Sequence, residues 1–271
     1  KYEAEIITAV GNFHGRTISI VTFSTEEFYR EAFGPFTPGF KNVAYGDLEA
    51  LEAAITPNTC AIMLEPIQGE NGVVLPPVGY LKGVAELCKK HNVLFIADEI
   101  QTGLCRTGKW LCCQHENVRP DMVCLGKALS GGMYPVSAVL ADKEILGLLR
   151  PGEHGSTFGG SPIASAVALA ALEVLDEEHL AERATELGEY FMGKLRAIKT
   201  KKVKEIRGKG LLIGVELYPE AGGARKYCEA LQSLGLLCKE THENVIRFAP
   251  PLVVDKKTLD WAIRRIAKVL K

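Results

Sequence analysis

The chain has 271 residues, with 32 lysines and arginines against 33 aspartates and glutamates, so its formal net charge is −1. This length is sufficient for a large hydrophobic core and for two domains. Because the charges nearly cancel, there is neither a basic field for nucleic acid nor an acidic tail. No apolar run approaches the roughly 18 residues that are needed to span a bilayer. We therefore expect no nucleic-acid partner and no membrane insertion.

The eight cysteines form no C-x-x-C pair, and most of them lie in apolar or helical contexts. We therefore expect reduced thiols inside a cell, and neither a disulfide framework nor a metal site. The chain begins with Lys1 instead of Met and enters a strand-like run almost at once, so we interpret it as a fragment without its N-terminal part. For that reason the choice between cytoplasm and mitochondrial matrix stays open.

Strand and helix signals alternate along the first half of the chain. Short apolar runs predict strands at 4–10, 17–22, 60–65, 92–98, 121–125 and 136–141. Between the third and fourth runs, apolar residues recur at helical spacing over 80–91 and predict an amphipathic helix. Such alternation is typical of a mostly parallel α/β sheet covered by helices.

The second half has a different pattern. Ser161 and Pro162, a favourable N-cap followed by proline at the first helical position, predict a long apolar helix over 163–175. Charged helices are expected near 177–198, 222–234 and 256–270, with short strands near 203–206, 211–217 and 245–249. We predict a large α/β domain over residues 1–165 and a smaller C-terminal α+β domain over residues 166–271.

Two polar residues stand where buried strands are expected to end. Asp98 follows the apolar run 93–97, and Lys127 follows the run 121–126. Ligands of parallel sheets bind outside the carboxyl ends of the strands. A lysine there can form a Schiff base, and a neighbouring carboxylate can pair with the pyridinium nitrogen of pyridoxal phosphate. From these two residues alone, a surface lysine and a helix-capping aspartate are the more common interpretation, because short motifs are weakly specific.

Two arginines are also candidates for binding a carboxylate group. Arg16 follows the turn-rich stretch 11–15, and Arg247 lies inside the apolar strand 244–248. A guanidinium inside an apolar strand is costly unless it meets a carboxylate. That carboxylate could belong to an internal acid such as Glu70 or to a substrate. The two interpretations are compatible, because the partners could alternate.

Several other signals are individually weak. Phe13 and His14 could offer a flat face to a planar ring, or could simply pack in the core. Gln101 could hydrogen-bond a ring hydroxyl or belong to the start of a helix. The loop 155–160 is rich in hydroxyl groups and glycines, which suits a phosphate but also an ordinary turn.

Seven segments along the chain carry a combined signal: Gly11-Asn-Phe-His-Gly-Arg-Thr17, Phe33-Gly-Pro-Phe36, Glu65-Pro-Ile-Gln-Gly-Glu70, Ala97-Asp-Glu-Ile-Gln-Thr-Gly103, Leu125-Gly-Lys-Ala-Leu-Ser-Gly-Gly132, Pro151-Gly-Glu-His-Gly-Ser-Thr157 and Ile246-Arg-Phe-Ala-Pro-Pro251. Together these segments closely resemble the class III pyridoxal-phosphate-dependent aminotransferases, and they occur in that family's order along the whole chain. The sequences at 33–36 and 126–132 are most similar to members that act on ornithine.

The resemblance implies a fold-type-I transferase that binds pyridoxal 5'-phosphate. Lys127 would hold the cofactor as a Schiff base and carry the proton, while Asp98 would keep the pyridine nitrogen protonated. The resemblance further implies that Phe13 stacks on the cofactor ring, that Gln101 bonds its phenolic oxygen, and that Ser156 and Thr157 contact the phosphate of the cofactor in a partner subunit.

For the substrates, the resemblance implies that Arg16 and Arg247 bind carboxylates. Glu70 would cover Arg247 while ornithine is bound. His14 receives no role.

The resemblance also implies a homodimer with shared active sites and small amino-acid and 2-oxo-acid substrates. The implied reaction moves the δ-amino group of L-ornithine to 2-oxoglutarate, giving glutamate semialdehyde and glutamate. Transfer from acetylornithine or 4-aminobutyrate is the main alternative, and a catalytically silent scaffold is another.

A P-loop nucleotide-binding protein is a further alternative, because the run 93–99 looks like the acidic strand end of such ATPases. Its partner motif, G-x-x-x-x-G-K-[ST], fails here. Lys127 is followed by Ala128, and Asp121 stands where the first glycine belongs.

Overall fold

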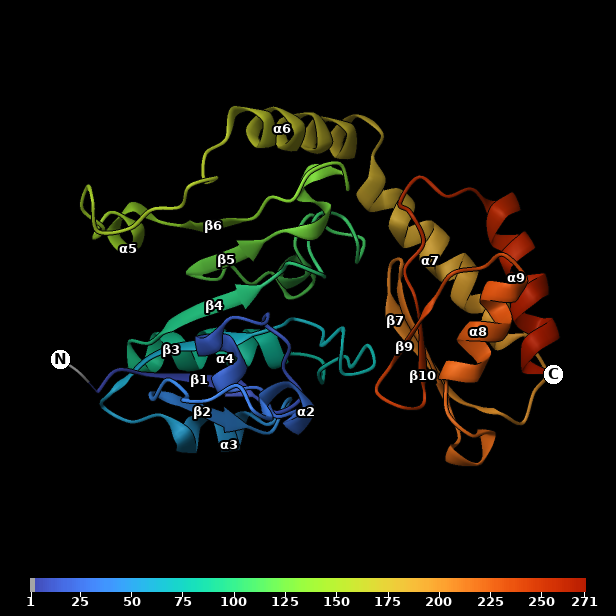
Figure 1. The fold of residues 1–271 in the computed structure, drawn as a ribbon, viewed down its shortest axis with the longest axis horizontal. Helices are drawn as coiled ribbons and strands as arrows, with labels where there is room; N and C mark the ends of the chain where they lie inside the picture. Colours follow the sequence, from blue (N-terminus) through green and yellow to red (C-terminus); the bar gives the residue numbers. More distant parts are fainter. Residues whose placement is uncertain (1–2) are drawn as a thin grey trace.

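The computed structural model of the chain describes residues 3–271, whose strands form one sheet of six and one sheet of four (Figure 1). The larger sheet has the order β2-β1-β3-β4-β5-β6, and only its β5–β6 pair is antiparallel. Its strands are β1 (Glu5–Ala9), β2 (Phe40–Val43), β3 (Thr59–Leu64), β4 (Leu94–Asp98), β5 (Met122–Leu125) and β6 (Ala138–Ala141).

Short helices and one long helix accompany this sheet: α1 (Ile18–Thr22), α2 (Glu27–Arg30), α3 (Leu48–Ala54), α4 (Tyr80–His91), α5 (Lys143–Leu146) and the 3-10 turns η1 (Cys112–Glu116) and η2 (Lys127–Ser130). The predicted helix over 80–91 is confirmed as α4. Its buried face, which includes Leu81, Val84 and Cys88, packs in one cluster with Phe95 of β4. Spacing of three and four residues places these side chains on one face of the helix.

The smaller sheet is entirely antiparallel, with the order β7-β8-β10-β9. It lies beside the larger sheet in Figure 1, and α6 and α7 lead the chain from one to the other. Its elements are α6 (Pro162–Glu177), α7 (Leu180–Arg196), β7 (Val203–Lys209), β8 (Leu212–Leu217), η3 (Pro219–Ala221), α8 (Arg225–Ser233), β9 (Lys239–Thr241), β10 (Val245–Phe248) and α9 (Lys256–Leu270).

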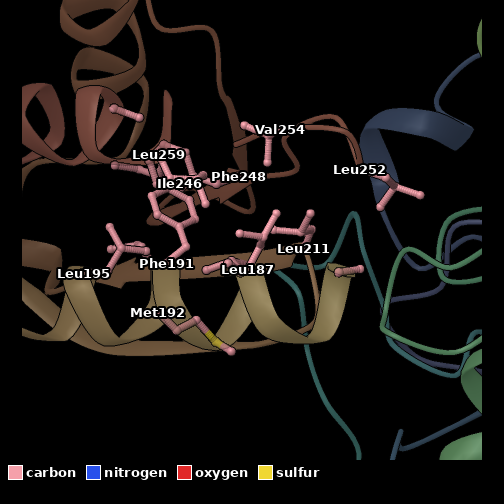
Figure 2. Packing of buried hydrophobic residues seen from close by; sticks show 14 of the residues in the cluster. Leu187, Phe191, Met192, Leu195, Leu211, Ile246, Phe248, Leu252, Val254 and Leu259 are labelled. Atoms are coloured by element: carbon pink, nitrogen blue, oxygen red, sulfur yellow. The ribbon is translucent and has the colours of Figure 1, made fainter. Parts of the chain in front are cut away.

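The core of this second part lies between its helices and its sheet, as Figure 2 shows. Leu187 and Phe191 of α7 point toward Phe248 of β10 and Leu259 of α9. The rings of Phe191 and Phe248 meet edge to face, with their centroids 5.9 Å apart. All four residues are buried, so their packing fixes α7 and α9 on the sheet.

One predicted strand is wrong, and several elements were not predicted. Residues 17–22 form helix α1 instead of a strand, because both edges of β1 are already occupied by β2 and β3. Only Val21 of this helix is buried, although the segment is rich in β-branched residues. The elements that were not predicted include β2, whose centre is Lys41 and Asn42, the helix α3 and the three-residue β9.

The α/β fold class is otherwise confirmed, with a mostly parallel sheet followed by a separate antiparallel one. The division between residues 165 and 166 falls inside α6 and stays a prediction. Among residues 3–271, no helix combines the length and apolar character that crossing a membrane requires.

Candidate active site

A cavity of about 950 Å³ opens where the carboxyl ends of β4 and β5 face the second part of the chain. Its walls come from the segments after these two strands, from α6, and from β10 and the turn that follows it. The predicted site residues Glu70, Gln101, Lys127 and Arg247 all line it. The structure therefore brings together side chains that are up to 177 residues apart in the sequence.

Lys127 enters this cavity from the end of β5. Gly126 separates it from the strand, and its own φ of 45° lies in the left-handed region, which is uncommon for a residue with a side chain. The residue is exposed on the open side of the cavity. Partial removal of the ammonium group from water lowers the pKa of Lys127, although the negative charge of Glu70 opposes this shift. A lowered pKa increases the fraction of nucleophilic neutral amine.

Asp98 ends the neighbouring strand and is 4% exposed. Its Oδ2 lies 2.6 Å from Nδ1 of His14, and its Oδ1 accepts a hydrogen bond from the Ile100 amide at 3.1 Å. The His14 side chain is fully buried, and its Nε2 has no hydrogen-bond partner among the residues described. The tautomer that carries its proton on Nδ1 satisfies this geometry, because it donates to the carboxylate and leaves no buried N–H unpaired. His14 thus orients Asp98, a role that sequence reasoning missed.

Glu65 is a second buried acid that sequence reasoning did not assign. Its carboxylate accepts hydrogen bonds from the backbone amides of Phe13 at 2.9 Å and Gly69 at 3.3 Å. Burial raises the pKa of Glu65 to about 7, and the hydrogen bonds from the Phe13 and Gly69 amides partly offset this increase. The residue thereby links the turn that carries Phe13 and His14 to the loop that carries Glu70.

The predicted pairing of Arg247 with Glu70 is confirmed. Nη1 of Arg247 donates to Glu70 Oε1 at 2.6 Å, and it also donates to Gln101 Oε1 at 3.0 Å and the Gly69 carbonyl at 3.1 Å. Gln101 donates in turn to Glu70 Oε1 at 3.2 Å, and Lys239 donates to Glu70 Oε2 at 2.9 Å. Burial alone would raise the pKa of Glu70, but the bonds from Arg247 and Lys239 outweigh it and lower the pKa to about 2.

The remaining predicted residues lie outside the cavity lining. The guanidinium of Arg16 stacks 3.8 Å from the ring centroid of Tyr29 and lies 5.4 Å from that of Phe13. Ser156 and Thr157 are exposed, and none of their hydrogen bonds within residues 3–271 reaches another predicted site residue. Within the same residues, no group of three or more His, Cys, Asp or Glu side chains could hold a metal ion.

The family model for class III aminotransferases matches residues 1–270, so the chain belongs to that family. It is 60% identical over 268 residues to the ornithine aminotransferase of Brevibacillus brevis and 59% identical over 269 residues to that of Bacillus subtilis. Both matches cover 99% of this chain and 66% of the relative. The chain therefore spans just under two thirds of the length of these relatives.

Solved structures agree with this assignment. An ornithine aminotransferase from Toxoplasma gondii, crystallised with oxidised glutathione and partly occupied by pyridoxal phosphate, superposes with a TM-score of 0.96 at 47% identity. That match covers 99% of this chain and 64% of the other. An acetylornithine aminotransferase from Elizabethkingia anophelis gives a TM-score of 0.86 at 46% identity and covers 99% and 66% of the two chains. The predicted fold-type-I architecture is thereby confirmed.

Proposed function

We propose that this protein is an aminotransferase that moves the δ-amino group of L-ornithine to 2-oxoglutarate, with pyridoxal 5'-phosphate as its cofactor. The observation that carries the proposal is the Glu70–Arg247 ion pair on the wall of the cavity that Lys127 enters. A lysine amine and a reversible carboxylate site in one cavity suit amine transfer between two unlike substrates. The similarity to ornithine aminotransferases along nearly the whole chain supports the same substrate.

The residues of the site fit the proposed cofactor. Lys127 offers an amine of lowered pKa, Asp98 offers a buried carboxylate on the adjacent strand, and the half-buried Phe13 offers an aromatic ring. When bound, pyridoxal phosphate supplies an electron-accepting ring and a reactive carbonyl carbon. Asp98 and Lys127 are the residues that would hold its two ends, and pyridoxal phosphate is present at the active site of the Toxoplasma relative.

Each side chain has a defined task in this proposal. Nζ of Lys127 would hold the cofactor through its carbonyl carbon, and its free amine would carry a proton to and from the substrate carbon. The carboxylate of Asp98, held by His14, would stabilise a proton on the pyridine nitrogen through its negative charge. We propose that Gln101 bonds the phenolic oxygen and that Phe13 stacks against the ring.

Glu70 and Arg247 form the gate, a name we use for this ion pair alone. Ornithine brings a cationic chain, which a bare Arg247 would repel, whereas Glu70 neutralises that charge. A 2-oxo dicarboxylate instead needs Arg247 to be free, and Arg247 then binds its carboxylate in a bidentate manner. Alternation of the gate therefore lets one cavity accept both substrates while excluding poorer matches. Arg16 is proposed as a second carboxylate ligand.

We also propose a homodimer in which Ser156 and Thr157 contact the cofactor phosphate of the partner subunit. Exposed apolar side chains are frequent around this loop, and an apolar surface of that kind on a folded protein favours association. Examples are Leu148 at 76% exposure, Phe158 at 81% and Ile163 at 63%.

We further propose an intracellular location, in keeping with eight free cysteines, all within the described residues.

The test is visible absorbance of the full-length protein with pyridoxal phosphate, before and after L-ornithine is added without a keto acid. We expect an absorbance band that requires Lys127 and that ornithine converts to the aminated cofactor form. The variant Lys127→Ala is the control and should lack the band. If acetylornithine or 4-aminobutyrate bleaches the band and ornithine does not, the family stands and the substrate assignment is wrong.

A further inference from the structure

Glu70 is shared between two cations that come from neighbouring strands. Lys239 of β9 and Arg247 of β10 are direct Cα partners in the antiparallel pair. Side chains of directly opposite residues lie on the same face of a sheet, where two like charges destabilise each other. Glu70, from the loop after β3, lies between them and binds each cation with a different carboxylate oxygen: Oε1 with Arg247 at 2.6 Å and Oε2 with Lys239 at 2.9 Å.

We propose that Lys239 is a specificity-determining residue of the gate: it retains Glu70 when Arg247 is released to bind a dicarboxylate. This inference rests on the proposed function. Because the two oxygens have separate partners, Glu70 can give up its Oε1 bonds to Arg247 and Gln101 and still keep its Oε2 bond to Lys239. Opening the gate therefore leaves no carboxylate without a counter-ion.

The two cations differ in their freedom to move, which determines which of them follows Glu70. Arg247 has a side-chain exposure of 13% and is anchored by the Gly69 carbonyl and by Gln101. Lys239 has a side-chain exposure of 60%, and Glu70 is the only hydrogen-bond or ion-pair partner of its ammonium group among residues 3–271. A lysine ammonium on a flexible stem can swing with its partner, whereas a fixed guanidinium cannot. Lys239 is therefore the mobile cation and Arg247 the stationary one.

Loss of Lys239 should act on one substrate class only. Without it, a half-buried Glu70 that leaves Arg247 would have no charged partner, so the closed gate becomes relatively more stable. The closed gate is the state that accepts ornithine, and the open gate is the state that accepts glutamate and 2-oxoglutarate. Because Lys239 is largely exposed, the expected effect on the dicarboxylates is roughly two- to five-fold, the usual range for such a pair.

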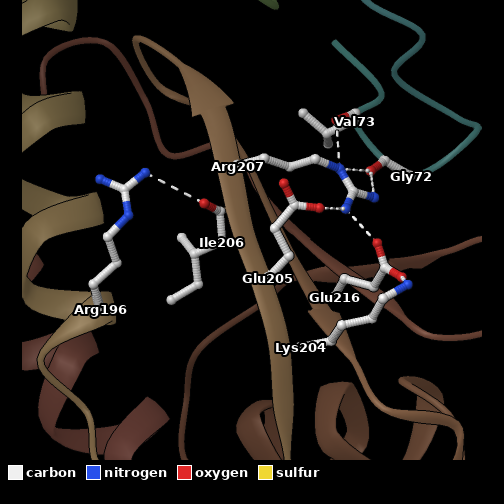
Figure 3. A network of polar contacts seen from close by, with 8 residues as sticks. All are labelled: Gly72, Val73, Arg196, Lys204, Glu205, Ile206, Arg207 and Glu216. Atoms are coloured by element: carbon white, nitrogen blue, oxygen red, sulfur yellow. Dashed lines mark hydrogen bonds and ion pairs between the residues drawn. The ribbon is translucent and has the colours of Figure 1, made fainter.

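The same sheet supplies a matched control (Figure 3). Lys204 of β7 donates to Glu216 Oε1 at 2.6 Å, while Arg207 binds the other oxygen of that carboxylate, so a lysine and an arginine again share one glutamate. The exposure of the Lys204 side chain is 53%, close to that of Lys239. None of these three residues lines the cavity. Lys204→Gln therefore removes an equivalent ion pair without touching the gate.

The experiment measures the two half-reactions separately by cofactor absorbance in the full-length protein and in Lys239→Gln, Lys239→Arg and Lys204→Gln. We expect Lys239→Gln to raise the apparent KM for L-glutamate and 2-oxoglutarate two- to five-fold, with kcat and the ornithine half-reaction unchanged. Lys239→Arg should restore the wild-type KM. Lys204→Gln should match the wild type with both substrates.

A second measurement does not depend on turnover. Glutarate, an unreactive dicarboxylate, should bind Lys239→Gln two- to five-fold more weakly in calorimetry, and should bind Lys204→Gln as it binds the wild type. Equal effects on ornithine and glutamate, or unchanged glutamate and glutarate constants, would overturn the proposal. If ornithine does not react even with the wild type, the proposed function has failed, and the glutamate and glutarate constants still decide the role of Lys239.

Discussion

Replacement of Glu65 by glutamine should change how the stability of the protein depends on pH. The pKa of this buried carboxyl is raised from 4.5 to about 7. In the folded protein Glu65 therefore keeps its proton up to about pH 7, whereas the unfolded chain releases it near 4.5. Between these values the folded state binds more protons, so the stability from this group is fully present below 4.5 and is lost as the pH rises through 7.

The size of the effect follows from the gap between the two pKa values. At about 1.4 kcal/mol per unit of pKa, the gap corresponds to roughly 3 kcal/mol of unfolding free energy. Glutamine carries no charge, so the Glu65→Gln variant lacks this component. Glutamine also offers only one acceptor oxygen to the amides of Phe13 and Gly69, and the resulting loss of about 1–3 kcal/mol does not vary with pH.

The assay is urea unfolding of the wild type and Glu65→Gln at several values between about pH 5 and pH 8. The wild-type free energy minus that of the variant should fall by roughly 2–3 kcal/mol across this range. The matched control is Glu116→Gln, because Glu116 also accepts two backbone amides, those of Gly79 and Lys82 at 3.0 Å, but lies nearer the surface. A difference that is constant or rises with pH would refute the reasoning.

Three further substitutions test the packing and the site. Phe191→Ala should lower the unfolding free energy by about 3–5 kcal/mol in urea titrations, because a ring that is 2% exposed leaves a cavity. His14→Phe should cost about 1.5–3 kcal/mol by leaving Asp98 without its buried donor, and unchanged stability would contradict that contact. Gly69→Ala would overlap the flexible end of Gln101, so calorimetric glutarate affinity should change while the urea midpoint barely moves.

The positions of Lys127 and Asp98 could be predicted because each follows an uninterrupted apolar run. Such runs identify buried strands, and parallel strands place their carboxyl ends together. The Glu70–Arg247 pair could be predicted as well, since a guanidinium in an apolar strand requires an acid. The pair is confirmed at 2.6 Å.

Other parts of the site could not be predicted from local sequence. His14 and Glu65 carry no periodic or motif signal of their own, and their roles depend on contacts with Asp98 and Phe13 across 84 and 52 residues. Lys239 belongs to a strand of three residues, too short to recognise, and only the register with β10 places it opposite Arg247. The roles of these residues depend on contacts between segments that are distant in the sequence, and local sequence patterns do not reveal such contacts.

The bonds of Arg247 cross from the small antiparallel sheet to the loop of the large sheet that carries Gly69 and Glu70. A ligand that redirects these bonds would also change the contacts that hold the two sheets together. Ligand affinity and the local opening free energy of β9 and β10 are therefore thermodynamically linked, and each must change with the other. Amide hydrogen exchange in these two strands should consequently differ between the ornithine-bound and dicarboxylate-bound protein, at a distance from the reacting atoms.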